Sequence, residues 1–170
     1  MTAVGADRPG IVAALTGVLL EIGGNLEDAR AALLRGSFAT VLAVAVPDDV
    51  GPDQVRAALA PVAEELGLGL WVGPAAPRPA GEPLARCVLS VYGADHPGIV
   101  HGITQALADH AANVVDLSAR LVGDPPVYIL GVEVELPPGL DARSLREALA
   151  PVAERHEVEM TLEAEEDEVL

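Results

Sequence analysis

Two short loops in this chain carry the residues best suited to bind a small charged molecule. Gly5–Val12 reads GADRPGIV, and Gly93–Val100 reads GADHPGIV. Pro-Gly followed by apolar residues at helical spacing predicts a tight turn into a helix, whose free N-terminal N–H groups and dipole favour a carboxylate. Asp7 and Asp95 in the same loops can accept hydrogen bonds from an ammonium group. Together these features match the two ends of a free amino acid.

Asn25 and Asn113 stand where the next strand is expected to begin. An amide side chain there offers both a donor and an acceptor to the same ligand. A purely structural interpretation is also open: Asp before X-Pro-Gly can cap a helix, Pro-Gly is common in turns, and Asn after Gly-Gly tolerates left-handed backbone. Repetition of the motif does not decide between the two, because duplicated structure also repeats.

Little else in the sequence suggests chemistry. The histidines are His96, His101, His110 and His156. No two of them have the i, i+4 spacing of a helical ligand pair, and none lies in a Cys/His cluster, so we expect no metal. Cys87 is the single cysteine and is expected to be a core thiol on a strand. Walker, G-x-S-x-G and G-x-G-x-x-G motifs do not occur, and we expect no cofactor.

An internal repeat predicts the elements that position the loops. The second copy follows the first by 88 residues (5 to 93), and later by 90 residues, as in Ala60–Glu64 and Ala150–Glu154. The offset changes because Gly36-Ser37 aligns with the longer segment Gly123–Pro126. Insertions collect in loops between strands, so this position is predicted to be a hairpin turn. Each copy reads β-α-β-β-α-β from its periodicities. This order predicts an α+β class, ferredoxin-like fold: an antiparallel four-stranded sheet with both helices on one face.

The expected core is aliphatic, because the chain has only one Phe, one Trp and two Tyr. The first helix of each copy is expected to bury one apolar stripe, and the second helix another. The first stripe comprises Ile11, Val12, Leu15, Val18, Leu19 and Ile22 in copy one, and Ile99, Val100, Ile103, Leu107 and Ala111 in copy two. Further strands in copy two are expected at about 86 to 92 and 114 to 121.

We expect four parts along the chain: a first module at 1–73, a Pro-rich linker at 74–84, a second module at 85–163 and an acidic tail at 164–170. Met1 aligns with Leu89, so the first strand of copy one is several residues short. Either this sheet edge is incomplete or the start of the chain is placed late.

The outer sheet faces of the two copies are expected to differ. Ala43, Ala45, Gly69 and Trp71 stand where the second copy has Glu133, Glu135, Glu159 and Thr161. An apolar outer face usually marks an interface, so we expect this face to pack against the other module or a second subunit.

The formal net charge of −16 argues against direct nucleic-acid binding, which depends on clustered Lys and Arg. The first ten residues lack the basic and apolar regions of a secretory signal, and each apolar run is too short to span a bilayer. We therefore expect a cytoplasmic protein with no membrane partner.

The run from Gly5 through Asp28, repeated from Gly93 through Asp116, resembles the ACT domain family. The family signature is a strand, G-x-D-x-P-G-I-V opening a helix, and Gly-x-Asn beginning the next strand. The resemblance implies a sensor that pairs side by side through its sheets and binds an amino acid between the loop of one module and the second strand of its neighbour. The implied site residues are Asp7, Gly10, Ile11 and Asn25, with Asp95, Gly98, Ile99 and Asn113.

A free-standing pair of this length resembles the family of glycine cleavage system transcriptional repressors, which act through protein contacts. This resemblance implies a homo-oligomeric regulator that senses a small amino acid, such as glycine or serine, and contacts a regulator protein. Similar pairs precede phosphoserine phosphatases, and a single module precedes formyltetrahydrofolate deformylases, so a detached regulatory part is one alternative. Because the chain ends at Leu170, we expect no catalysis. A ligand-free assembly module is the other alternative.

Overall fold

The expected order of elements is present twice in the computed structural model, which describes residues 1–75 and 84–164. The chain divides into two units, Met1–Pro79 and Ala80–Leu170, called module 1 and module 2 below. Module 1 contains β1 (Thr2–Ala6), α1 (Ile11–Glu21), β2 (Asn25–Leu34), β3 (Ser37–Ala45), α2 (Pro52–Leu66) and β4 (Gly69–Trp71). Module 2 contains β5 (Arg86–Gly93), α3 (Ile99–Asp109), β6 (Asn113–Val122), β7 (Val127–Glu135), α4 (Ala142–Arg155) and β8 (Glu159–Ala164).

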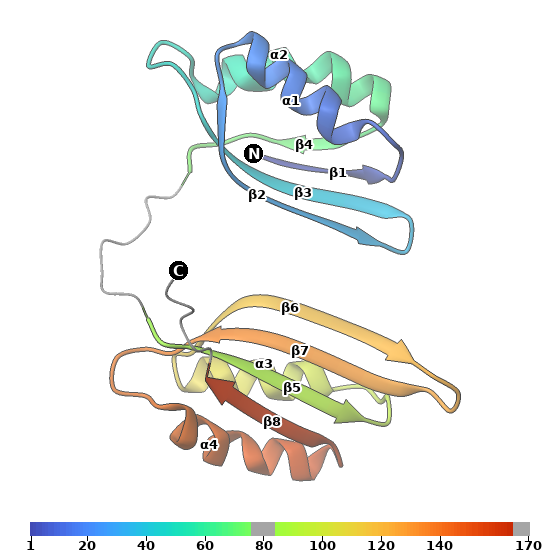
Figure 1. Cartoon of the computed structure of the whole chain (residues 1–170), viewed down its shortest axis with the longest axis vertical. Coiled ribbons are helices and arrows are strands. Elements are labelled where there is room, and N and C mark those ends of the chain that lie inside the picture. Colours follow the sequence, from blue (N-terminus) through green and yellow to red (C-terminus); the bar gives the residue numbers. More distant parts are fainter. Residues whose placement is uncertain (76–83, 165–170) are drawn as a thin grey trace. The chain divides into compact units, whose positions relative to one another are not determined.

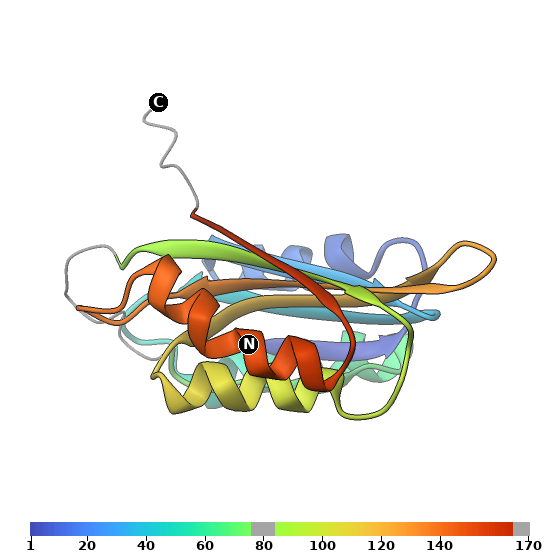
Figure 2. The same cartoon turned by 90° about the horizontal axis from the view of Figure 1, so that it is seen from below.

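Each module has one antiparallel sheet, ordered β2-β3-β1-β4 in module 1 and β6-β7-β5-β8 in module 2. Both helices of a module lie on the same face of its sheet (Figures 1 and 2). The expected ferredoxin-like fold is confirmed. In this order the first strand of each module is central. The loop that follows it therefore lies near the β2–β3 hairpin in module 1 and near the β6–β7 hairpin in module 2.

Each module buries its own aliphatic core. Leu15 and Leu59 are fully buried in module 1, as are Leu107 and Leu149 in module 2. The expected stripes of α1 and α3 are confirmed at their i, i+4 positions, and these buried residues are Ile11, Leu15, Leu19, Ile99, Ile103 and Leu107.

Two residues of the expected stripes do not face the core. Val12 is 46% exposed, because the residue after buried Ile11 is turned away from the sheet by the helical period. Ala111 lies beyond the end of α3, with a φ of 54°, and the buried residue there is Ala112. The chain leaves the helix before Ala111, so the helical spacing no longer predicts its direction.

The modules differ as their alignment predicts. β1 has five residues against eight in β5, and β4 has three against six in β8. On the outer face of module 1, Trp71 is 61% exposed and Ala45 and Gly69 are also exposed, whereas Ala43 is half-buried. The expected partner for this face stays a prediction.

Few residues of the expected linker and tail are described. Residues 76–83 and 165–170 lie outside the described part of the chain. Ala164, expected to begin the tail, is the last residue of β8 and pairs with Cys87. Among the described helices, none has the length and apolar character needed to cross a membrane.

Candidate functional site

The two motif loops have the same backbone shape. Asp7 and Asp95 are exposed; Asp7 is the first residue after β1, and Asp95 is the second residue after β5. Gly10 and Gly98 are the N-cap residues of α1 and α3, with φ values of 93° and 103°. A side chain at this left-handed φ would be strained, which explains the glycine in both loops.

The first helical residues fix these loops to the core. Ile11 and Ile99 are each 2% exposed and belong to the aliphatic clusters of their modules. The backbone N–H of Asp7 also donates to the carbonyl of Gly36 at 2.9 Å, which ties the loop to the β2–β3 hairpin. The loop backbone is therefore positioned before any ligand arrives.

The N-termini of α1 and α3 have no side-chain cap and no acidic residue in their first turns. The structural interpretation of Asp7 and Asp95 as helix caps is therefore wrong. By contrast, Asp141 caps α4 by accepting a hydrogen bond from the Ser144 N–H at 2.7 Å, and this bond lowers the pKa of Asp141. The N–H groups in the first turns of α1 and α3 remain available to an anion.

The residue between Asp and Pro in each motif contacts the second helix of its module and so holds the loop against it. In module 1, Arg8 Nη2 donates to the Leu66 carbonyl at 2.7 Å. In module 2, His96 Nε2 lies 2.7 Å from the His156 carbonyl oxygen, and the two imidazole rings stack with centroids 5.3 Å apart. A donor suits this position, because the last carbonyls of a helix lack partners. Arg8 and His96 thus have the same role with different chemistry.

Removing these anchors is expected to loosen the loops. We expect Arg8→Ala or His96→Ala to cost about 1 kcal/mol of local stability through the lost hydrogen bond, which is roughly fivefold faster amide exchange in residues 5–12 or 93–100 respectively. Hydrogen exchange measured by mass spectrometry checks this. His101→Ala, on the exposed face of α3, is the matched control. Equal exchange in the anchor and control variants would show that the anchors do not hold the loops.

An aromatic residue lies beside each loop, and the sequence patterns did not single it out. Phe38 pairs with Gly5, and Tyr128 pairs with Gly93, so each aromatic residue is the second residue of the strand next to the loop. Burial, and secondly the negative charge of Asp95, raise the pKa of Tyr128. Tyr128 therefore keeps its proton and can donate a hydrogen bond near the loop, whereas Phe38 cannot. The two loops consequently have different polar surroundings.

Asn25 and Asn113 lie at the other end of the sheet from the loop of their own module. Asn25 pairs with Ala45 at the end of β3, whereas Asp7 contacts Gly36 at its beginning. β3 has nine residues, so at about 3.4 Å per residue its ends are about 27 Å apart. Module 2 repeats this arrangement, with Asn113 paired to Glu135. A ligand in one loop therefore cannot contact the Asn of the same module.

Other chemistry is sparse in the described residues. They contain no group of three or more His, Cys, Asp and Glu side chains that could hold a metal ion. Cys87 is 1% exposed in the module 2 core, and burial raises the pKa of its thiol, as expected for a packing residue.

A family model and proteins of known sequence match this chain. The ACT domain model matches residues 1–72 and again 86–163. The glycine cleavage system transcriptional repressor of Escherichia coli is 29% identical over 120 residues, which cover 71% of this chain and 63% of the repressor. A UPF0237 protein of Methanopyrus kandleri is 42% identical over 73 residues, which cover 42% of this chain and 81% of that protein.

Solved structures share the two-module arrangement of elements. The crystal structure of an unknown protein from Galdieria sulphuraria superposes with a TM-score of 0.81 and 28% identity, covering 97% of this chain and 96% of that one. A structure assigned to a glycine cleavage system transcriptional repressor has a TM-score of 0.76 at 20% identity, covering 98% of this chain and 95% of that one, and supports the fold alone. With both modules matched by the family model over nearly their full length, the chain belongs to the ACT domain family.

Proposed function

We propose that this protein senses a free small amino acid at its motif loops and passes the bound state to a partner protein. The observation that carries the proposal is the pair of uncapped helix N-termini, α1 and α3, each preceded by an exposed aspartate. The helix N–H groups would bind the ligand carboxylate, and Asp7 or Asp95 its ammonium group. A small ligand such as glycine or serine suits this short loop.

The separation of loop and asparagine supports a site shared between a module and the same module of a second copy. β2 is an edge strand whose residues are all exposed. If two β2 edges pair antiparallel, the start of one lies beside the end of the other, which brings Asn25 of a second copy toward the loop that contains Asp7. The same geometry applies to β6 and Asn113. This proposal therefore includes a homo-oligomer that is assembled through sheet edges.

A regulatory role suits this chain better than catalysis. It shares the ACT family with a relative named for transcriptional repression. The formal charge of −16 disfavours direct contact with DNA, so the output of the sensor would be a protein contact. An amino acid that stabilised one oligomeric arrangement would change the surface offered to that partner.

A thermal-shift screen against the twenty amino acids tests the proposal. A ligand that binds only the folded protein adds about 2.7 kcal/mol of stability at 100 times its dissociation constant. The amide and the N-acetyl derivative of the best ligand serve as controls, because each lacks one of the two charges that the loop recognises. We expect stabilisation by the free amino acid and little by either derivative. If no amino acid shifts the transition, the sensor function is excluded and a ligand-free assembly module remains.

A further inference from the structure

The two motif loops are anchored to equivalent carbonyl groups by side chains of different chemistry. Leu66 and His156 align in the repeat and lie at the ends of α2 and α4. Arg8 donates to the Leu66 carbonyl, and His96 Nε2 lies 2.7 Å from the His156 carbonyl oxygen. Arginine keeps its charge at all ordinary pH values, whereas histidine is the residue type whose charge changes between about pH 5 and 8. Of the two anchors, only the one in module 2 can therefore change its charge in this range.

The residue that supplies the acceptor carbonyl in module 2 is itself a histidine, and its ring lies against the ring of His96. The two imidazole rings are stacked, with centroids 5.3 Å apart and planes inclined by 19°. Both residues are half-buried. The hydrogen bond from His96 Nε2 to a carbonyl suits a neutral or a protonated ring, because this nitrogen can carry a hydrogen in both forms. A first proton can therefore bind to the pair while the anchor stays intact.

His156 also packs against the start of α3. A Cβ atom added to Gly98 would lie 3.2 Å from His156 Cε1, and one added to Gly102 would lie 2.9 Å from His156 Nε2. The two glycines thus leave room for the ring beside the N-terminus of α3, where the helix dipole is positive. A positive charge on His156 is disfavoured by this dipole and also by a protonated His96.

In the described part of the chain, no acidic side chain forms an ion pair with either ring. The other titratable side chains on the motif loop, the start of α3 and the stretch from the end of α4 to β8 are all exposed. They are Asp95, His101, Glu154, Arg155, Glu157 and Glu159. Tyr128 beside the loop stays neutral, because burial and the charge of Asp95 raise its pKa. Since water screens exposed charges, the carboxylates compensate a second positive charge on the pair only weakly.

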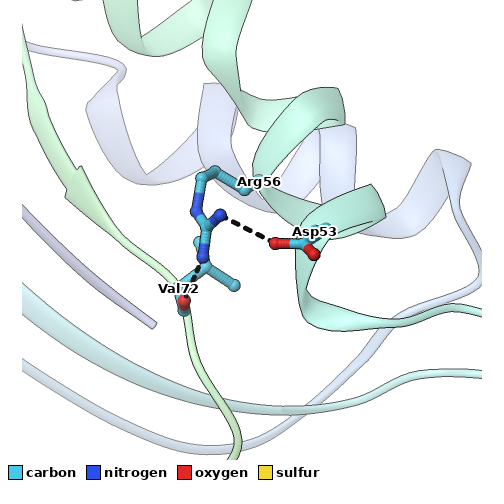
Figure 3. Close-up of polar contacts among 3 residues, drawn as sticks. All are labelled: Asp53, Arg56 and Val72. Atoms are coloured by element: carbon cyan, nitrogen blue, oxygen red, sulfur yellow. Dashed lines mark hydrogen bonds and ion pairs between the residues drawn. The ribbon is translucent and has the colours of Figure 1, made fainter.

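The helix that carries the acceptor carbonyl is fixed to its sheet in both modules by an arginine. Arg56 of α2 donates to the Val72 carbonyl at 2.9 Å and pairs with Asp53 at 2.8 Å (Figure 3). Arg146 of α4 makes the same contact with the Leu162 carbonyl in module 2. Because arginine keeps its charge, these attachments persist when histidines are protonated. Separation of the two rings is therefore expected to move the loop and not the helix.

We propose that the His96–His156 pair is a pH-sensitive switch, which keeps the module 2 motif loop attached to α4 near neutral pH and detaches it when both rings are protonated. The attached loop accommodates one proton on the pair, whereas the detached loop accommodates two. The attached form thus binds fewer protons, so its stability falls as the pH falls through the histidine range. The module 1 loop, held by Arg8, stays attached over the same range. A consequence that rests on the proposed function is that amino-acid binding weakens in acid at module 2 and not at module 1.

Hydrogen exchange of the full chain without any ligand, compared at about pH 7.5 and about pH 5, tests the switch. Each rate is divided by that of an unstructured peptide at the same pH, because intrinsic exchange depends on pH. We expect the protection of residues 93–100 to fall at least about fivefold in acid, which is the effect of losing one anchoring hydrogen bond. We expect the protection of residues 5–12 to change less than about twofold. Equal changes in the two loops would overturn the proposal.

A substitution that copies module 1 separates the paired rings from a general effect of acid. His156→Leu gives module 2 the side chain found at Leu66 and keeps the backbone carbonyl that accepts from His96. We expect residues 93–100 of this variant to stay protected in acid, whereas His101→Leu, at an exposed position of α3, keeps the full response. If His156→Leu leaves the response unchanged, paired charges do not cause it and the proposal is wrong. No ligand is present, so these results do not depend on the sensor function.

Discussion

A chain that carries both Asp7→Ala and Asp95→Ala is expected to lose its stabilisation by the amino acid that the screen identifies. At 100 times the dissociation constant, this is a loss of about 2.7 kcal/mol of ligand-dependent stability. Both carboxylates are exposed and cap no helix, so we expect the unliganded stability to stay within about 0.5 kcal/mol of the original. Thermal denaturation with and without ligand measures both quantities.

The controls separate a lost site from a lost charge. Asp48→Ala with Asp124→Ala removes the same charge from exposed positions outside the motif loops, and we expect it to keep the full shift. A chain that carries both Asn25→Ala and Asn113→Ala tests the shared site. We expect the ligand to shift its unfolding less, while the stability of the unliganded protein stays the same. If the chain with Asp7→Ala and Asp95→Ala keeps its ligand-induced shift, the ligand does not bind at these loops.

Leu59→Ala and Leu149→Ala are expected to give the largest losses of folding stability, each confined to one module. Both side chains are 0% exposed and lie at equivalent positions of α2 and α4. Removing a buried leucine leaves a cavity and costs about 2–5 kcal/mol. Since each module has its own core cluster, we expect Leu59→Ala to lower protection only in module 1 and Leu149→Ala only in module 2.

Hydrogen exchange across a denaturant series, followed separately for peptides of each module, measures this effect. Val12→Ala is the control, because Val12 is 46% exposed and should cost about 0.5 kcal/mol or less. Equal loss of protection in both modules after either leucine substitution would contradict separate cores. That result would mean that the modules unfold as one cooperative unit.

Much of the fold was predictable because its signals are local or repeated. The alternation of Val132 and Val134 with Glu133 and Glu135 reports one buried and one outer face, and the structure confirms it. Corresponding elements also recur in both copies at matching positions, which helps to locate each of them. The predicted burial of Val12 and Ala111 was wrong because helical spacing does not define where a buried face ends. Val12 lies one residue beyond the buried positions, and Ala111 lies past the end of α3.

The candidate site was less predictable because its contacts join distant parts of the sequence. Arg8 contacts the Leu66 carbonyl, and His96 contacts the His156 carbonyl. The partners are separated by about sixty residues in the sequence, so no local pattern predicts these contacts. The position of Asn25 required the register of β2 against β3, which the motif does not encode. Tyr128 could have been noticed from its alignment with Phe38, two aromatic residues in a chain that has few.

A crystal structure with the amino acid from the thermal screen shows whether the motif loops bind it. We expect ligand density at Gly10 or Gly98, with the carboxylate on the N–H groups of the following helix and the ammonium group beside Asp7 or Asp95. We also expect the Asn25 or Asn113 side chain of a neighbouring copy at the same ligand. Density that lies away from both loops, in a protein shown to bind that amino acid in solution, would mean that the loops are not the sensor site.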